Sequence, residues 1–305
     1  MITDLRCCAR AWERGDESTG SAPAAATHAL VELPLPWPSK VESTAVVSAL
    51  TEALGGDAKV KAVVPDEWRP SPPGQTRVIL HRAEDAEFRG YARTSISVPT
   101  TELAEGGASL REALAAASPA SGVDVLVCTH GSRDRCCGSL GTSLAARLRL
   151  GEAATVWRSS HLGGHRFAPT ALLLPSGTAW AWLDDELLAA ILHRTMEPAA
   201  LRRHYRGTTA FGHPAVQLLE AEAFAAVGWS WLDGPRTGRV VVELGPGAEW
   251  AVEVTGAGGA WEGVVRKVGE VPQPVCGQPD EASVKQDAIY ELSDVARRPA
   301  PGAAR

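Results

Sequence analysis

The chain has 305 residues, of which 45% are hydrophobic and 22% charged, which is the balance of an ordinary globular protein with room for about two domains. Its formal net charge of −6 and the lack of a basic patch argue against nucleic acid as a partner. No apolar run reaches the roughly 18 residues that span a bilayer, and residues 1–14 lack the apolar core of a signal peptide, so we expect a cytoplasmic protein with no membrane partner.

The pattern of residues 1–120 predicts an N-terminal α/β region. Its first 25 residues are small and polar and predict little regular structure. The remaining elements are bounded by proline, glycine or capping residues, and we expect a strand over 29–33, a helix over 43–54, strands over 77–81 and 94–98, and a helix over 109–117.

The pattern of residues 121–208 predicts a second unit, which begins with a short β-branched run. We expect a strand over 123–127, a helix from 138 or 139 to 150, a strand over 155–158, a loop over 159–167, strands over 170–174 and 178–183, and a helix over 184–194. This β-α-β-β-α order is typical of the core of a thioredoxin-like fold. We therefore predict an α/β protein, with a thioredoxin-like domain flanked by additional α+β segments on both sides.

Residues 209–305 form the third predicted region, a C-terminal α+β extension. We expect a helix over 214–227, strands over 239–244, 250–255 and 263–268, and a frayed end over 297–305. The domain boundaries fall near residues 120 and 208. The sequence shows no internal repeat.

The residues most able to bind a metal lie in two short segments of the middle region. Residues 128–138 read C-T-H-G-S-R-D-R-C-C-G, and residues 159–167 read S-S-H-L-G-G-H-R-F. Each segment follows a predicted strand, so two thiolates and two imidazoles meet if both loops leave the same sheet edge. Both ligand types bind iron or zinc. The candidate metal ligands are Cys128, Cys137, His161 and His165.

Several neighbours fit supporting roles around such a site. Gly163 and Gly164 allow positive φ and a close backbone approach. Arg133 and Arg166 place positive charge nearby. We expect Asp134 to orient an arginine or a ligand histidine, and His130 to lie beside the site rather than to bind metal.

The other cysteines are harder to place. Cys136 and Cys137 are adjacent, so only one of them faces the site easily, and the register favours Cys137, which precedes Gly138. Cys136 is then interpreted as a small buried hydrophobe. Cys7, Cys8 and Cys276 have no partner at metal-site spacing and are interpreted as structural or incidental.

At these residues the chain closely resembles the sucrase/ferredoxin-like family. The matching segments are CTHGSRDRCCG, VWRSSHLGGHRFAPTALLLPSG and HYRG at residues 204–207. The family is similar to thioredoxin-like [2Fe–2S] ferredoxins, with H-x3-H standing here where those carry C-x3-C. The resemblance implies a [2Fe–2S] cluster on Cys128, Cys137, His161 and His165, and the C-x8-C spacing selects Cys137 over Cys136.

The same resemblance implies electron transfer. With both histidines on one iron, the centre is Rieske-like in ligand type. The reduction potentials of such centres span roughly −150 to +300 mV, whereas plant-type clusters with four cysteine ligands have potentials of about −400 mV. No G-x-G-x-x-G follows a predicted strand, so no bound dinucleotide is implied. We therefore expect a carrier served by a separate reductase or electron-acceptor protein rather than a complete enzyme.

Two alternatives use the same residues. The first is a structural zinc ion bound by the same two cysteines and two histidines. A zinc protein is colourless, and this distinguishes it from a protein that holds an iron–sulfur cluster. A thiol–disulfide redox protein would require C-x-x-C at a helix N-terminus, which this chain lacks. A pure scaffold role is disfavoured because all four candidate ligands are present.

Overall fold

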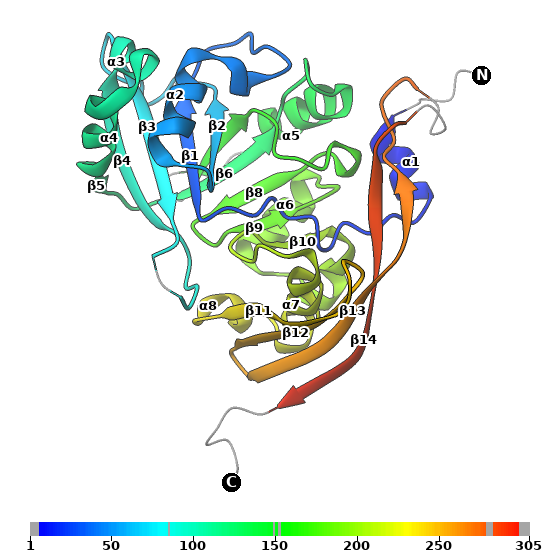
Figure 1. The fold of residues 1–305 in the computed structure, drawn as a ribbon. Coiled ribbons are helices and arrows are strands. Elements are labelled where there is room, and N and C mark those ends of the chain that lie inside the picture. The colour runs from blue at the N-terminus through cyan, green and yellow to red at the C-terminus, as the bar shows by residue number, and fades with distance from the viewer. Residues whose placement is uncertain (1–5, 85, 149, 152–153, 279–282, 299–305) are drawn as a thin grey trace.

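The computed structural model describes residues 6–84, 86–148, 150–151, 154–278 and 283–298. A mixed ten-stranded sheet carries helices packed against it, and a four-stranded antiparallel sheet follows in the C-terminal part (Figure 1). The predicted mixed α/β class is therefore confirmed. Among the described residues, no helix is both long and apolar enough to cross a bilayer.

The large sheet has the strand order β10-β9-β8-β6-β7-β2-β1-β3-β4-β5. Its strands are β1 (Thr27–Glu32), β2 (Ala58–Val63), β3 (Gln75–Arg82), β4 (Ala92–Pro99), β5 (Ser118–Pro119), β6 (Val123–Cys128), β7 (Ala154–Ser159), β8 (Ala171–Leu174), β9 (Thr178–Trp180) and β10 (Tyr205–Thr208). The small sheet consists of β11 (Thr237–Gly245), β12 (Glu249–Gly256), β13 (Gly259–Pro272) and β14 (Gln286–Arg298).

The helices are mostly short and connect these strands. The α-helices are α1 (Cys7–Glu13), α2 (Ala45–Leu54), α3 (Thr100–Glu105), α4 (Gly107–Ala115), α5 (Thr142–Arg147), α6 (Asp185–His193), α7 (Pro214–Val227) and α8 (Ser230–Asp233). Three 3-10 helices are η1 (Val41–Ser43), η3 (His165–Phe167) and η4 (Pro198–His204), and η2 (Cys137–Gly141) is a short π-helix.

The large sheet is built from two units with the same connectivity. In the first unit β1 pairs in parallel with β2 and antiparallel with β3, which pairs with β4. In the second unit β6 pairs in parallel with β7 and antiparallel with β8, which pairs with β9. A helix connects the parallel pair in each unit. The sequence shows no repeat, so this duplication is visible only in the topology.

The two units join through β2 and β7, where Val63 is paired with Ser159. Backbone hydrogen bonds extend the joint, with Ser160 N–H donating to the Ala62 carbonyl at 2.8 Å and Val64 N–H to the Arg158 carbonyl at 2.9 Å. One buried apolar cluster includes Leu30 of the first unit and Leu126 of the second. The first unit is thus packed directly against the second.

The structure corrects several element predictions. Residues 7–13 form helix α1 in a segment predicted to lack structure, and β2, α3 and β14 were not anticipated. The helix predicted up to residue 150 ends at Arg147 after a π-helical turn, and the strand predicted up to 183 ends at Trp180. Arg297 and Arg298 belong to β14, and the rest of the predicted frayed end, 299–305, lies outside the described residues.

Other predictions hold closely. The helix predicted over 214–227 is α7, with Pro214 in its first turn. Asp184 is the N-cap of α6, where its Oδ1 accepts a hydrogen bond from Leu187 N–H at 2.7 Å. Helix α7 contacts β10 on one side and β11, β12, β13 and β14 on the other, so it connects the two sheets.

His28 on β1 is a buried histidine with a strongly altered acidity. Its side chain is 1% exposed, and its Nε2 lies 3.0 Å from Thr209 Oγ1. Burial, reinforced by the charges of Lys61 and His81, lowers the pKa of His28 to about 3. The folded protein therefore keeps this imidazole neutral at pH values where the unfolded chain protonates it.

We expect His28 to make the protein sensitive to mild acid. The unfolded chain binds a proton at His28 below pH 6.5, whereas the folded protein does so only near pH 3, so stability falls as the pH decreases through this window. Between pH 7.5 and 5.0 the loss amounts to about 2 kcal/mol. Urea unfolding at both pH values should show this loss in the native protein and a smaller one in His28→Gln. The exposed His193→Gln serves as the control, and equal losses in all three proteins would refute the assignment.

Candidate metal centre

Three of the four candidate ligands converge at one edge of the second unit. Cys128 ends β6, Cys137 begins η2, and His161 follows β7. Because β6 and β7 are parallel neighbours, with Cys128 paired to Ser159, both loops leave the same sheet edge. One ligand atom from each of Cys128, Cys137 and His161 lies within 4.8 Å of the others. Both cysteines are 1% exposed, and His161 is half-buried.

Glycines let η2 lie directly against the end of β6. A Cβ on Gly141 would lie 1.9 Å from the Cys128 carbonyl oxygen, and a Cβ on Gly138 would lie 2.4 Å from the Gly131 Cα. No other residue fits either position without moving the backbone. This close approach brings Cys137 beside Cys128.

The electrostatics of the group favour a thiolate at Cys128. The hydrogen bond from Cys137, together with one from His161, holds the pKa of Cys128 well below its usual range, despite burial. The same hydrogen bond, with burial, raises the pKa of Cys137. Nδ1 of His161 is buried and has no hydrogen-bond partner among the described residues. Two thiols and an unpartnered imidazole nitrogen are a suitable donor set for a soft or borderline metal.

His165 lies next to this group but is not part of it. Its ring centroid is 6.4 Å from that of His161, and its Nδ1 is 3.1 Å from Asp134 Oδ2. Burial alone would lower the pKa of His165, but the hydrogen bond and charge of Asp134 outweigh it and raise the pKa. Gly163 and Gly164 precede it with φ of 80° and 66°, the positive values expected from the sequence.

The remaining predicted neighbours take different positions. His130 accepts the His161 N–H at Nδ1 over 3.2 Å, and its Nε2 lies 2.9 Å from the Pro38 carbonyl oxygen. Arg133 is exposed, with its guanidinium 3.4 Å from the Ser39 carbonyl oxygen. Pro38 and Ser39 follow β1, so the first unit covers the site through this turn.

Arg166 lies on the other side of His165. Its guanidinium is buried and forms ion pairs with Asp16 and with Asp287, the latter at 2.7 Å. It also lies 4.1 Å from the centroid of the Phe167 ring. Arg166 therefore connects the histidine loop to segments near both ends of the described chain.

Two cations near the site were not predicted. Lys61 Nζ donates to the His161 carbonyl at 2.6 Å, and burial lowers the pKa of Lys61 while Cys128 acts in the opposite direction. Arg206 is 2% exposed and donates to the Gly163 carbonyl at 3.2 Å. Burial lowers the pKa of Arg206 to about 10, and the negative charge of Cys128 opposes that change. Arg206 could have been found from its place in the HYRG segment, whereas no pattern in the sequence singles out Lys61.

The cysteines interpreted as structural or incidental lie close to Cys136, which was interpreted as a small buried hydrophobe. Cys7, Cys136 and Cys276 bring their sulfur atoms together with a carboxylate oxygen of Asp134, all within 4.8 Å of one another. Cys8 Sγ lies 3.4 Å from Cys136 Sγ. Cys136 and Cys137, adjacent in the chain, thus point into different groups.

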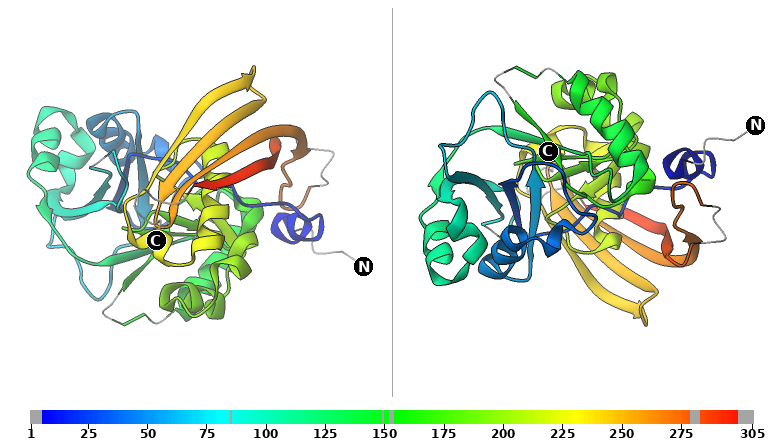
Figure 2. Two further views of the ribbon diagram at one scale, coloured as in Figure 1. Left: turned by 90° about the horizontal axis from the view of Figure 1, so that it is seen from below. Right: turned by 90° about the horizontal axis from the view of Figure 1, so that it is seen from above.

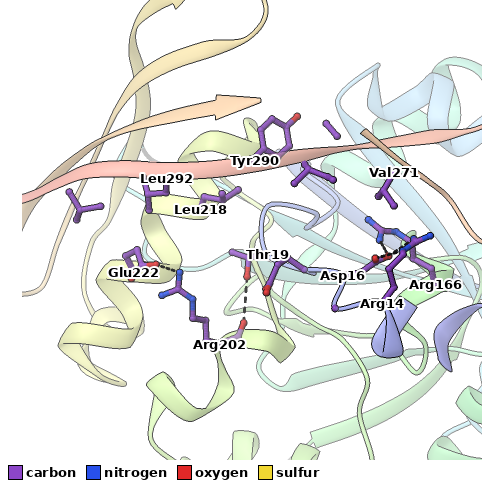
Figure 3. A pocket seen from close by; sticks show the side chains of 15 residues that line it. Arg14, Asp16, Thr19, Arg166, Arg202, Leu218, Glu222, Val271, Tyr290 and Leu292 are labelled. Atoms are coloured by element: carbon purple, nitrogen blue, oxygen red, sulfur yellow. Dashed lines mark hydrogen bonds and ion pairs between the residues drawn. The ribbon is translucent and has the colours of Figure 1, made fainter. Parts of the chain in front are cut away.

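A cavity of about 600 Å³ opens beside this region, between the segment after α1, helix α7 and strand β14 (Figure 3). Four of its charged residues form two ion pairs, Arg166 with Asp16 and Arg202 with Glu222. Tyr290 and Leu292 line the wall that β14 contributes. None of the four candidate metal ligands lines this cavity.

A family model described as sucrase/ferredoxin-like matches residues 18–207, more than half of the chain. No curated protein matches the chain, and no solved structure matches it. The matched range contains Cys128, Cys137, His161 and His165, whereas Cys7, Cys8 and Cys276 lie outside it.

Proposed function

This chain belongs to the sucrase/ferredoxin-like family, and we propose that it holds a [2Fe–2S] cluster on Cys128, Cys137, His161 and His165 and transfers single electrons. Its partner in this proposal is a separate reductase or electron-acceptor protein. The thioredoxin-like character of the site-bearing unit belongs to the same proposal. It is supported by the strand order β7-β6-β8-β9, in which β6 and β7 are parallel and β8 is antiparallel to both neighbours.

The observation that carries the proposal is the convergence of Cys128, Cys137 and His161 at one buried sheet edge. His161 also has a buried Nδ1 with no hydrogen-bond partner among the described residues, and such a polar atom costs free energy unless a ligand or water reaches it. Thiolate and imidazole together suit iron. The donor set therefore fits the group that the family name suggests.

His165 fits as the fourth ligand through its other nitrogen. Its Nδ1 is engaged by Asp134 Oδ2 at 3.1 Å, so Nε2 is the nitrogen that the proposal assigns to the metal. Metal-binding histidines commonly donate their second ring N–H to a carboxylate, which fixes the ring orientation. Asp134 in turn is held by the backbone, since its Oδ1 accepts Cys136 N–H at 2.8 Å.

When bound, the cluster supplies one-electron redox chemistry. The cysteines are buried while His161 and His165 are half-buried, so the histidine side is the shorter route for an electron between the site and a docked protein. Lys61 and Arg206 contribute positive charge at the backbone of the histidine loop, which favours the more negative, reduced state. Unbridged thiols at all six cysteines suit the cytoplasm, which is the proposed location.

The test is the visible spectrum of protein purified without oxygen, with iron, sulfide and zinc assayed on the same sample. We expect a brown protein that dithionite bleaches, with about two iron and two sulfide per chain and a potential above about −400 mV. Cys128→Ser should remove both iron and sulfide, because it deletes a buried ligand.

The matched control is Cys136→Ser, which changes the adjacent cysteine in the same way and should keep the iron and sulfide. A colourless protein whose zinc disappears in Cys128→Ser, and which fails cluster reconstitution, would assign the site to structural zinc instead. Loss of the chromophore in Cys136→Ser together with its retention in Cys137→Ser would overturn the choice of Cys137 as ligand.

A further inference from the structure

Four cysteines form a second sulfur-rich group next to the proposed cluster site. The sulfur atoms of Cys7, Cys136 and Cys276 form a triangle with sides of 3.5 Å (Cys7–Cys136), 3.0 Å (Cys136–Cys276) and 3.4 Å (Cys276–Cys7). Cys8 Sγ lies 3.4 Å from Cys136 Sγ. Cys7, Cys8 and Cys136 are at most 5% exposed, and Cys276 is half-buried.

The structure assigns to this group a zinc site with the ligands Cys7, Cys8, Cys136 and Cys276. It is separate from the proposed cluster and goes beyond the proposed function.

The sulfur separations indicate one metal ion. A disulfide would hold two sulfurs about 2.05 Å apart, well below every separation in this group. Tetrahedral thiolates at about 2.3 Å from a zinc ion lie about 3.8 Å from one another, close to the observed sides of 3.0–3.5 Å. In a four-iron cluster each thiolate binds a different iron, which requires the sulfurs to lie much farther apart. A compact set of four thiolates is typical of structural zinc.

Cys8 rather than Asp134 completes the set. The Asp134 carboxylate lies within range, but its oxygens already serve other groups: Oδ1 accepts the N–H of Cys136 at 2.8 Å, and Oδ2 is 3.1 Å from His165 Nδ1. The Cys8 thiol lies outside the group of ligand atoms that are all within 4.8 Å of one another, but it is 3.4 Å from Cys136 Sγ and completes the set by a small movement toward the ion. Asp134 therefore lies between the two sites and orients His165, while the four sulfurs share the ion.

The ligands come from three distant parts of the chain. Cys7 and Cys8 lie on α1, Cys136 precedes η2, and Cys276 follows β13. Both views of Figure 2 show α1 beside the end of the long hairpin formed by β13 and β14, and Arg10 donates to the Val275 carbonyl at 2.7 Å. The ion would thus fasten the N-terminal helix and the C-terminal sheet to the turn that carries Cys137. Three of its four ligands lie outside residues 18–207, so this site is an addition to the matched family region.

The test uses the full chain and measures zinc separately from iron and sulfide. We expect about one zinc per chain in the native protein, beside the iron and sulfide of the proposed cluster. Cys276→Ser, at a half-buried loop position, should lower zinc affinity by more than about 100-fold and leave iron and sulfide in place. Cys128→Ser should do the reverse, removing iron and sulfide while zinc stays bound.

A second measurement begins with the native protein and so does not depend on a variant that folds. Native protein stripped of zinc by a chelator should bind one cobalt ion with the charge-transfer and d–d bands of tetrahedral thiolate coordination. Cys8→Ser should weaken these bands, whereas Asp134→Asn should keep them. A native protein with neither zinc nor these cobalt bands overturns the zinc site. So does zinc that is lost in Cys128→Ser and retained in Cys276→Ser. Absence of iron with zinc retained would overturn the cluster alone.

Discussion

Gly141→Ala should abolish metal binding at the Cys128 site and lower the free energy of unfolding by about 3 kcal/mol. The added methyl carbon would lie 1.9 Å from the Cys128 carbonyl oxygen and 3.0 Å from its carbonyl carbon, and both are backbone atoms of a central strand. Since neither β6 nor η2 can rotate a side chain away, the two elements must separate, and overpacking of this kind costs up to several kcal/mol. Cys137 then moves away from Cys128.

The measurements are iron and sulfide content together with urea unfolding of the same preparation. Gly56→Ala is the matched control, because it lies in a loop with no atom within 4 Å of the added carbon and without positive φ. It should retain its iron and unfold within about 0.5 kcal/mol of the native protein. A Gly141→Ala protein with full iron content and native stability would show that η2 does not pack on β6 as described.

Arg236→Met should destabilise the protein by about 3–5 kcal/mol, because it leaves a buried carboxylate without its cation. Arg236 and Glu220 have fully buried side chains, and the Arg236 Nη1 lies 3.3 Å from Glu220 Oε1. Tyr205 donates to the same carboxylate at 2.8 Å and Trp231 at 3.1 Å. The carboxylate thus joins β10 to α7, α8 and the start of the small sheet.

Arg239→Met is the control for this prediction. Arg239 pairs with Glu253 at 2.9 Å on the surface of the small sheet, with its side chain 64% exposed, so its removal should cost less than about 1 kcal/mol. The double variant Arg236→Met/Glu220→Leu should recover part of the stability lost in Arg236→Met, because no buried charge is left alone. Similar losses for Arg236→Met and Arg239→Met by urea unfolding would contradict the buried pair.

The sequence predicted the parts of the fold whose signals are local. The β-branched run at 123–127 and the capped helix at 214–227 are strong local patterns, and both are present. The strand β2, in contrast, reads A-K-V-K-A-V, and its two lysines and two alanines leave too weak an apolar signal to distinguish it from a loop. The strand β14 mixes acidic and apolar residues and is defined by its partner β13 rather than by its own composition.

The candidate site could likewise be predicted only where its residues lie close together in the sequence. Cys128, Cys137, His161 and His165 lie within two short segments after predicted strands, so residue type, spacing and the family resemblance pointed to them. The group of Cys7, Cys8, Cys136 and Cys276 joins three segments that are more than 125 residues apart in the chain, and no spacing rule links such segments before the fold is known. The pairing of Asp134 with His165 depends in the same way on how two loops meet.

The ion pair between Arg166 and Asp287 bears on the order in which the protein matures on the ribosome. Residues up to 207 emerge first and contain all four proposed cluster ligands, whereas the segment from Cys276 to Asp287 is made some seventy residues later. At about 5–20 residues per second, synthesis leaves an interval of several seconds in which the histidine loop lacks its C-terminal contacts. The proposed cluster would meet the histidine loop without its C-terminal contact in that interval, and completion of β14 then adds the ion pair of Asp287 with Arg166.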